Sequence, residues 1–264
     1  MARSELKGAS YFAGTVAFIG ASFFSAENLH FPTSSHENIN PYRQELSSSG
    51  VWGFAHNGAD IPELLPYNLE TRAKSIEADV LWENGRLDIG HNLGFPSQTT
   101  GFWNERTTNY FDSAIKAITD SGKDVHFDIK FNTKPDSQAA ISMRQVIAQI
   151  RKDRTITISG KNWELVNSIR AARENSIGLF SVQKNKDFVK LFSFLEKNNL
   201  QGDIGVSIKE DMVDEELVEQ LKEKGLLVVV WGVDSPKRAV ELVRLGVAGI
   251  TTDNPAILNA LGNR

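Results

Sequence analysis

The sequence has no cysteine among its 264 residues. This absence excludes disulfide bonds, a thiolate nucleophile and every zinc site built on cysteine. The chain also lacks a basic run, because its formal net charge is -4 and its lysines and arginines are spread along its length. We therefore expect no nucleic-acid partner. No Gly-x-Gly-x-x-Gly turn follows the first predicted strand, which argues against a dinucleotide-binding fold.

Hydrophobic residues make up 41% of the chain and charged residues 23%. These are the proportions of a globular protein with a sizeable core. The length allows one large domain or two small ones, and barrels of alternating strands and helices need about 250 residues. We therefore expect one domain.

An apolar run at residues 9–26 follows two basic residues, Arg3 and Lys7. This pattern is typical of an export signal, so we expect residues 1–26 to form a signal peptide or an uncleaved membrane anchor. Basic residues before the run predict that the rest of the chain lies outside the cytoplasm, either secreted or held at a membrane through residues 9–26. An amphipathic or buried N-terminal helix is the alternative.

Residues 27–50 are rich in serine, asparagine and proline and lack periodicity, which predicts a linker. Over residues 51–264, short apolar runs alternate with stretches of helical spacing. Eight of the runs have the character of strands: VWGFAH, SIEADVLW, DVHFDIKF, RTITIS, IGLFSV, IGVSIK, LLVVVWGV and VAGITTD. Strand and helix repeated to eight predict an α/β fold, a (β/α)8 TIM barrel, over residues 51–264.

Acidic residues alternate with apolar ones in the second predicted strand, SIEADV. Residues two apart on a barrel strand share a face. Ile76, Ala78 and Val80 would face the helices, which directs Glu77 and Asp79 to the barrel interior. Both residues lie at the end of the barrel where active sites are built.

The third predicted strand repeats this alternation and directs His126, Asp128 and Lys130 inward. Buried carboxylates are costly without partners, so three of them together predict one shared divalent cation. Carboxylate oxygens suit Mg²⁺ or Ca²⁺. An internal salt bridge of Glu77 and Asp79 with Lys130 is the structural alternative. His126 lies one step deeper, where it would support the site rather than bind the ion.

Two histidines bracket the Glu-x-Asp pair. His56 closes the first predicted strand, and His91 closes the short extended piece RLDIGHN that follows the second. A lone histidine at a strand end is more often a satisfied polar residue than a catalyst. Imidazole titrates near neutral pH, so a neutral and a charged histidine can serve as base and acid in one turnover.

Five segments, in order along the chain, carry a resemblance to a known family: GFAHNG, SIEADV, LDIGHN, HFDIK and VVVWGVDSPKRAVELVRLGVAGITTDNP. Over residues 52–258 the chain resembles the glycerophosphodiester phosphodiesterase superfamily of PLC-like phosphodiesterases. The resemblance implies a TIM barrel in which His56 and His91 are the acid/base pair and Lys130 contacts the phosphate. It implies three metal ligands: Glu77, Asp79 and Asp128.

Two departures narrow the resemblance. The family's usual enzymes have arginine directly after the first histidine, whereas this chain has Asn57. They also have a long insertion between the second histidine and the third acidic residue, whereas only a short segment separates His91 from Asp128 here. Asp128, in place of glutamate, is closer to the Menorin and sphingomyelinase D-like offshoots. Without this arginine, we expect weaker binding of a glycerophosphate headgroup. The expected substrates are glycerophosphodiesters and lysophospholipids.

Further residues are candidates for substrate binding. Asn57 takes the place of the family's arginine beside the first histidine. Trp231 shares a face with Val229 at the end of the seventh strand, where its indole would form the base of a substrate pocket. Packing of Trp231 in the core is an equal alternative to this role. Ser207 and Lys209 share the inward face of the sixth strand, which makes Lys209 a candidate second cation beside the phosphate.

These residues predict a metal-dependent phosphoric diester hydrolase. The metal and Lys130 would neutralise phosphate oxygens while one histidine activates the attacking hydroxyl and the other protonates the leaving alkoxide. Water as the attacker gives a monoester, whereas a substrate hydroxyl gives a cyclic phosphate, and the sequence favours neither. Two alternatives remain: a Schiff-base role for Lys130, which nearby acids disfavour, and a catalytically idle extracytoplasmic binding or adhesion module.

Overall fold

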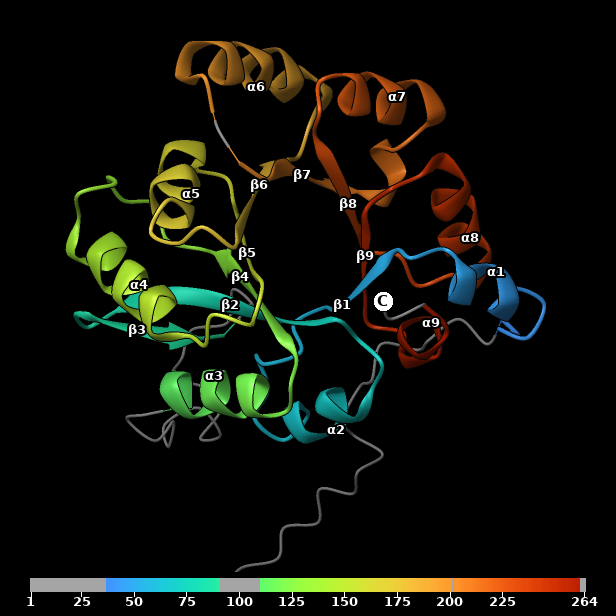
Figure 1. Cartoon of the computed structure of the whole chain (residues 1–264), viewed down its shortest axis with the longest axis horizontal. Helices are drawn as coiled ribbons and strands as arrows, with labels where there is room; N and C mark the ends of the chain where they lie inside the picture. Colours follow the sequence, from blue (N-terminus) through green and yellow to red (C-terminus); the bar gives the residue numbers. More distant parts are fainter. Residues whose placement is uncertain (1–36, 91–109, 201, 262–264) are drawn as a thin grey trace, which may run out of the picture. The chain divides into compact units, whose positions relative to one another are not determined.

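The computed structural model describes residues 37–90, 110–200 and 202–261, which contain a barrel of eight parallel strands (Figure 1). The strands are β1 (Trp52–Ala55), β2 (Ser75–Glu83), β4 (Asp124–Ile129), β5 (Ile156–Gly160), β6 (Ser176–Val182), β7 (Ile204–Lys209), β8 (Leu227–Trp231) and β9 (Gly249–Thr252). The first strand pairs in parallel with both β2 and β9, so the sheet closes on itself. The predicted (β/α)8 fold is confirmed.

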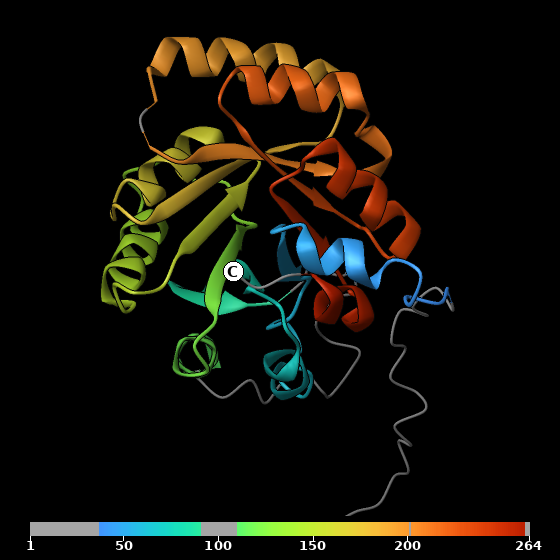
Figure 2. The ribbon, with the colours of Figure 1, turned by 45° about the vertical axis from the view of Figure 1, so that its right-hand side comes forward.

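Helices lie around the outside of the strands, as the turned view in Figure 2 shows. Within the described residues, an α-helix follows each barrel strand. These helices are α2 (Leu65–Glu70), α3 (Tyr110–Asp120), α4 (Gln138–Gln149), α5 (Trp163–Arg170), α6 (Asn185–Asn198), α7 (Glu215–Glu223), α8 (Pro236–Leu245) and α9 (Pro255–Ala260).

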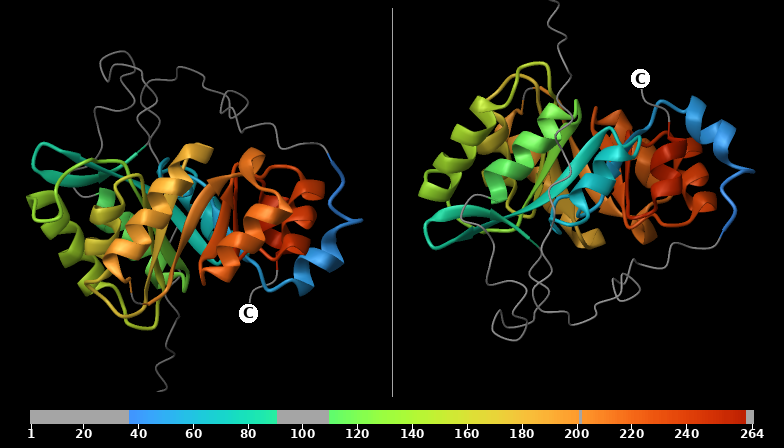
Figure 3. Two further views of the ribbon diagram at one scale, coloured as in Figure 1. Left: turned by 90° about the horizontal axis from the view of Figure 1, so that it is seen from above. Right: turned by 90° about the horizontal axis from the view of Figure 1, so that it is seen from below.

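Strand β3 (Arg86–Ile89) pairs antiparallel with the end of β2, and both views in Figure 3 show the two side by side. The turn between them is Asn84-Gly85, with φ angles of 51° and 78°. Positive φ at both positions is what a type I′ hairpin turn requires, and asparagine followed by glycine is its preferred sequence. The hairpin returns the chain to the site, where the backbone N–H of Gly90 donates to the carbonyl of Asp79 at 2.9 Å.

Side chains alternate along β2 as the sequence predicts. Ile76, Ala78 and Val80 are fully buried in the apolar layer between strands and helices. Glu77 and Asp79 are buried on the opposite face, inside the barrel. The apolar row stabilises the strand by burial, which leaves the inner face available for polar residues.

A separate apolar cluster fills the barrel interior on the N-terminal side of the polar residues. Its buried members are Phe54, Ile177, Leu179 and Val229. The ring of Phe54 packs edge-on against His126, with centroids 5.3 Å apart. A Cβ atom on Gly249 would lie 2.5 Å from the Phe54 ring, so this position needs glycine. The cluster closes the interior from one side and leaves the site open at the other.

The structure differs from the linker predicted at residues 27–50, because Arg43–Ser48 form helix α1. Leu46 is fully buried, and α1 contacts α8 and α9. The guanidinium of Arg244 donates to both carboxylate oxygens of Glu45, at 2.7 and 2.9 Å. A single buried leucine gives no periodicity, so the sequence pattern does not predict this helix.

The predicted signal or anchor, residues 1–26, lies outside the described residues. Val51, the first residue of the predicted barrel domain, is buried and directly precedes β1. Among the helices that the structure does describe, none is both long enough and apolar enough to cross a bilayer.

We expect Leu46→Ala to lower the free energy of unfolding by about 2–5 kcal/mol, the usual cost of emptying a buried leucine site. Urea unfolding of the purified protein measures this change. Val189→Ala on α6 is the control, because Val189 is 71% exposed and its truncation should change stability by less than about 0.5 kcal/mol. Equal stability of the two variants would mean that α1 does not belong to the folded domain.

Candidate active site

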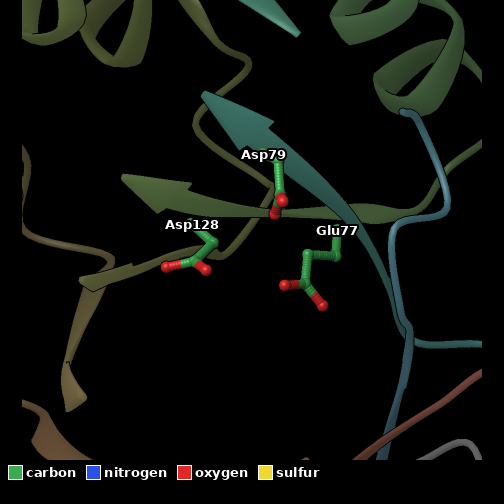
Figure 4. A group of neighbouring side chains, drawn as sticks. All are labelled: Glu77, Asp79 and Asp128. Carbon is green, nitrogen blue, oxygen red and sulfur yellow. The ribbon is translucent and has the colours of Figure 1, made fainter. Parts of the chain in front are cut away.

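Three carboxylates meet between two neighbouring strands, level with the end of β1. The parallel register of β2 and β4 aligns Glu77 with His126 and Asp79 with Asp128. One oxygen from each of Glu77, Asp79 and Asp128 lies within 4.8 Å of the others. Figure 4 shows the three side chains on one side of the two strands with their carboxylates close together. The fold therefore brings together all three predicted metal ligands.

Lys130 compensates two of the three carboxylates. Its ammonium lies 3.1 Å from Asp79 Oδ2 and forms an ion pair with Asp128. The predicted structural alternative, an internal salt bridge with Lys130, is thus realised in part, with Asp128 instead of Glu77 as the second partner. Glu77 is 5% exposed, and its Oε2 makes no hydrogen bond within the described ranges.

A buried carboxylate oxygen without a hydrogen bond is costly. The cluster offers only carboxylate oxygens, the donors that hard cations prefer. The donor set and the uncompensated oxygen of Glu77 both fit a divalent cation such as Mg²⁺ or Ca²⁺.

Burial and mutual charge shift the pKa values within the cluster. Burial raises the pKa of Glu77 well above its usual value, although the charge of His56 opposes this shift. Burial acts in the same direction on Asp128, but the ammonium of Lys130 holds the pKa of Asp128 below its usual range. Burial lowers the pKa of Lys130, but Asp128 and Asp79 outweigh it and raise this pKa above its usual value. Lys130 is therefore protonated, which disfavours the Schiff-base alternative.

His126 supports Asp128 through a serine. Nε2 of His126 donates to Ser159 Oγ at 2.9 Å, and Ser159 Oγ donates to Asp128 Oδ1 at 2.8 Å. Burial lowers the pKa of His126 to about 4, so its imidazole is neutral. With the proton on Nε2, the acceptor Nδ1 faces Oε2 of Glu77 at 3.9 Å. Two facing acceptors favour a proton or a cation nearby, in agreement with the raised pKa of Glu77.

His56 follows β1, and its imidazole contacts a carboxylate from the far end of the chain. Nδ1 donates to Asp253 Oδ2 at 3.0 Å, which leaves Nε2 for proton transfer. Burial alone lowers the pKa of His56, but the hydrogen bond to Asp253 and the charges of Glu77 and Asp79 raise it to about 9. Asn57 has a φ of 48°, a left-handed conformation that asparagine adopts more readily than most residues.

Three supporting residues carry no role in the sequence analysis: Asp60, Ser159 and Asp253. Asp60 Oδ1 accepts the backbone N–H of Asp79 at 2.9 Å, and burial together with the charge of Asp79 raises the pKa of Asp60 to about 7. The strand pattern could have identified Ser159, because it occupies an inward position of β5 in register with Asp128. Asp253 lies in the TTDNP segment of the resemblance, but no local pattern links it to β1.

The site opens into a cavity of about 1150 Å³. Four of the candidate catalytic and metal-binding residues line it: His56, Glu77, Asp128 and Lys130. Two further candidates for substrate binding, Asn57 and Trp231, also line it, as does Ser207.

Two predicted residues that the structure describes, Asp79 and Lys209, do not line the cavity. Asp79 is fully buried. The ammonium of Lys209 pairs with Asp211 at 2.9 Å, and Lys209 is not among the residues that line the cavity. Lys209 ends β7, and its carboxylate partner lies two residues further along the chain. His91 lies outside the described residues, and Gly90, the last described residue before it, is hydrogen-bonded to Asp79.

The fold is a closed barrel, and an acidic cluster, a lysine and a histidine lie at one end of its strands. These features define a (β/α)8 protein whose site can bind a cation and an anion. The model of the glycerophosphoryl diester phosphodiesterase family matches residues 98–257, more than half of the chain. The chain belongs to this family. The matched residues include Asp128 and Lys130, whereas Glu77 and Asp79 precede them.

Solved structures show the same fold. A phosphodiesterase of Oleispira antarctica, in complex with the product sn-glycerol-3-phosphate, is 18% identical with a TM-score of 0.63, over 79% of this chain and 96% of its own. A glycerophosphodiester phosphodiesterase of Parabacteroides distasonis is 18% identical with a TM-score of 0.56, over 78% of this chain and 94% of its own. Among curated protein sequences, none matches this chain.

We expect Asp253→Asn to lower the pKa of His56 in protein treated with a chelator. The amide keeps a hydrogen-bond acceptor but removes the charge that favours imidazolium. The folded-state pKa of His56 lies above its usual 6.5, so its interactions stabilise the fold below about pH 6.5, and this contribution is lost as the pH rises through about 9. The stability difference between wild type and variant should shrink over the same range.

An NMR titration of the His56 ring measures this pKa. Asp211→Asn is the matched control, because Asp211 pairs with Lys209 and should leave the titration of His56 unchanged. An unshifted His56 in Asp253→Asn would contradict the assigned hydrogen bond.

Proposed function

We propose that this protein is a metal-dependent phosphoric diester hydrolase that acts on a glycerophosphodiester or a lysophospholipid-type substrate. The observation that carries the proposal is the convergence of three carboxylates, one lysine and one histidine, all but Asp79 lining a single cavity, in a chain of this family. Each group has a separate task in phosphodiester cleavage, and the cavity gives the substrate access to the site.

Glu77, Asp79 and Asp128 would hold the cation. Bound there, a Mg²⁺ or Ca²⁺ ion supplies positive charge against the phosphate oxygens. Lys130 supplies a second positive charge, since its ammonium already lies against Asp79 and Asp128 and 30% of its side chain is exposed. A substrate phosphate beside Lys130 would share this ammonium with the carboxylates.

His56 and His91 would transfer the protons. His56 presents Nε2 because Asp253 holds Nδ1, and we assign it as the base that activates the attacking water. A base must be neutral before it accepts a proton. Glu77 and Asp79 raise the pKa of His56 and are also the proposed cation ligands, so occupancy of their site would lower this pKa toward neutrality. His91 would then protonate the leaving alkoxide.

We expect Glu77→Gln to remove the thermal stabilisation that Mg²⁺ or Ca²⁺ gives to the wild type. A ligand present at a hundred times its Kd stabilises the folded state by about 2.7 kcal/mol, which a melting curve resolves. Glutamine keeps the volume of the side chain but loses the charge that the cation needs. Calorimetric titration with the same ions measures binding directly.

Glu164→Gln is the control for this change, because Glu164 lines the same cavity from α5 but is not part of the carboxylate cluster. It should bind the ion as the wild type does. Undiminished ion binding by Glu77→Gln would exclude the proposed metal site.

We expect both His56→Ala and His91→Ala to lose activity, by about 100- to 10,000-fold on an alkyl phosphodiester. A p-nitrophenolate leaves with little protonation, so on a p-nitrophenyl phosphodiester His91→Ala should recover far more activity than His56→Ala. Steady-state kcat values on the two substrates, with ion binding confirmed for each variant, measure this difference. Equal recovery, or wild-type rates in either variant, would refute the division of roles.

A further inference from the structure

The cavity extends well to one side of the catalytic residues. The extension, which we call the side arm, is formed by residues after β4, β5 and β6 and by helices α5 and α6. The residues used below to define it are Phe131, Lys161, Trp163, Gln183, Lys190 and Phe194. Toward β7, β8 and β9 the described lining is limited to Ser207, Trp231 and Thr251.

Aromatic rings form one wall of the side arm. Trp163 and Phe194 are half-buried, and their ring centroids lie 5.8 Å apart. The indole N–H of Trp163 donates to the carbonyl of Ser181 at 3.1 Å, which fixes the orientation of the ring. Phe131, directly after Lys130, is half-buried and lines the same cavity. A ligand group in the side arm therefore meets preformed aromatic surface close to the phosphate position.

Polar groups line the rest of the side arm and carry no net charge. Lys161 and Lys190 are balanced by two acidic residues of the same cavity, Glu164 and Asp187. Gln183 is exposed and lines the same cavity. A charged substituent would find as much repulsion as attraction here. The lining favours a neutral ligand that makes many hydrogen bonds.

A long acyl chain fits this lining poorly. It would displace water from the amide, ammonium and carboxylate groups without replacing the hydrogen bonds, and such groups reject a ligand that leaves them unpaired. A ring or chain that carries several hydroxyls satisfies them, while its C–H face packs on the fixed aromatic rings.

We propose that the side arm binds a polyhydroxylated alcohol, a sugar or cyclic polyol, as one of the two alcohols of the phosphodiester. This inference rests on the proposed function for the chemistry at the phosphate. It narrows the substrates to diesters that join glycerol or another small alcohol to a neutral polyol.

The test compares kcat/KM for glycerophosphoinositol, glycerophosphoethanolamine, lysophosphatidylcholine and methyl p-nitrophenyl phosphate, each with Mg²⁺ or Ca²⁺. We expect the inositol ester to exceed the ethanolamine ester at least tenfold and to exceed the lysophospholipid. Gln183→Ala and Lys190→Ala should each lower the ratio of the inositol ester to the methyl p-nitrophenyl ester about three- to tenfold, since each removes a hydrogen-bonding group.

Lys186→Ala is the matched control, because Lys186 is an exposed lysine of the same helix, α6, and does not line the cavity. It should leave the ratio unchanged. Cleavage of methyl p-nitrophenyl phosphate together with equal rates on the inositol and ethanolamine esters would overturn the side-arm proposal alone. Preference for the lysophospholipid would overturn it in favour of an acyl-chain site.

Failure to cleave any diester would instead reject the proposed function, and direct binding then decides the side arm. Calorimetry with myo-inositol 1-phosphate should show binding that Gln183→Ala and Lys190→Ala weaken and Lys186→Ala does not. No detectable binding, or equal binding by all variants, would overturn the inference.

Discussion

Repulsion among three carboxylates in one buried space is the constraint on which the site depends. The register of β2 and β4 fixes it, because Glu77 and Asp79 are placed beside His126 and Asp128 by backbone pairing rather than by side-chain choice. This repulsion shifts the pKa values of the neighbouring groups. Lys130 is held protonated by two of the acids, His56 gains a proton, and Glu77 has a pKa raised well above its usual value. A cation at the cluster would lower the pKa values of His56 and Glu77 together.

The sequence predicted the barrel because each strand leaves a local signature. Alternation in SIEADV and DVHFDI required only that apolar residues face the helices, and this placed Glu77, Asp79 and Asp128 correctly. The same reasoning failed at Lys209, since alternation predicts a direction but not which partner a long side chain reaches at a strand end. Helix α1 was missed because its stabilising contacts, through Leu46 and Glu45, come from α8 and α9.

The supporting contacts of the site were beyond local pattern. Ser159 lies 31 residues from Asp128 in the sequence, and Asp253 lies 197 residues from His56. Such pairs become visible only when the closed sheet sets neighbouring strands side by side. Even then, the fold shared with the phosphodiesterases of known structure identifies only the scaffold, and the reaction has to be argued from the residues at the ends of the strands.

The contact between His56 and Asp253 joins the residue after the first barrel strand to the residue after the last. A ribosome makes the chain from its N-terminus, and the acid that contacts His56 is therefore added 197 residues after it. Until β9 docks against β1, the imidazole would lack the hydrogen bond to Asp253 that raises its pKa. The protonation state of His56 thus depends on closure of the barrel, so an unclosed chain carries the residues of the site without their electrostatics.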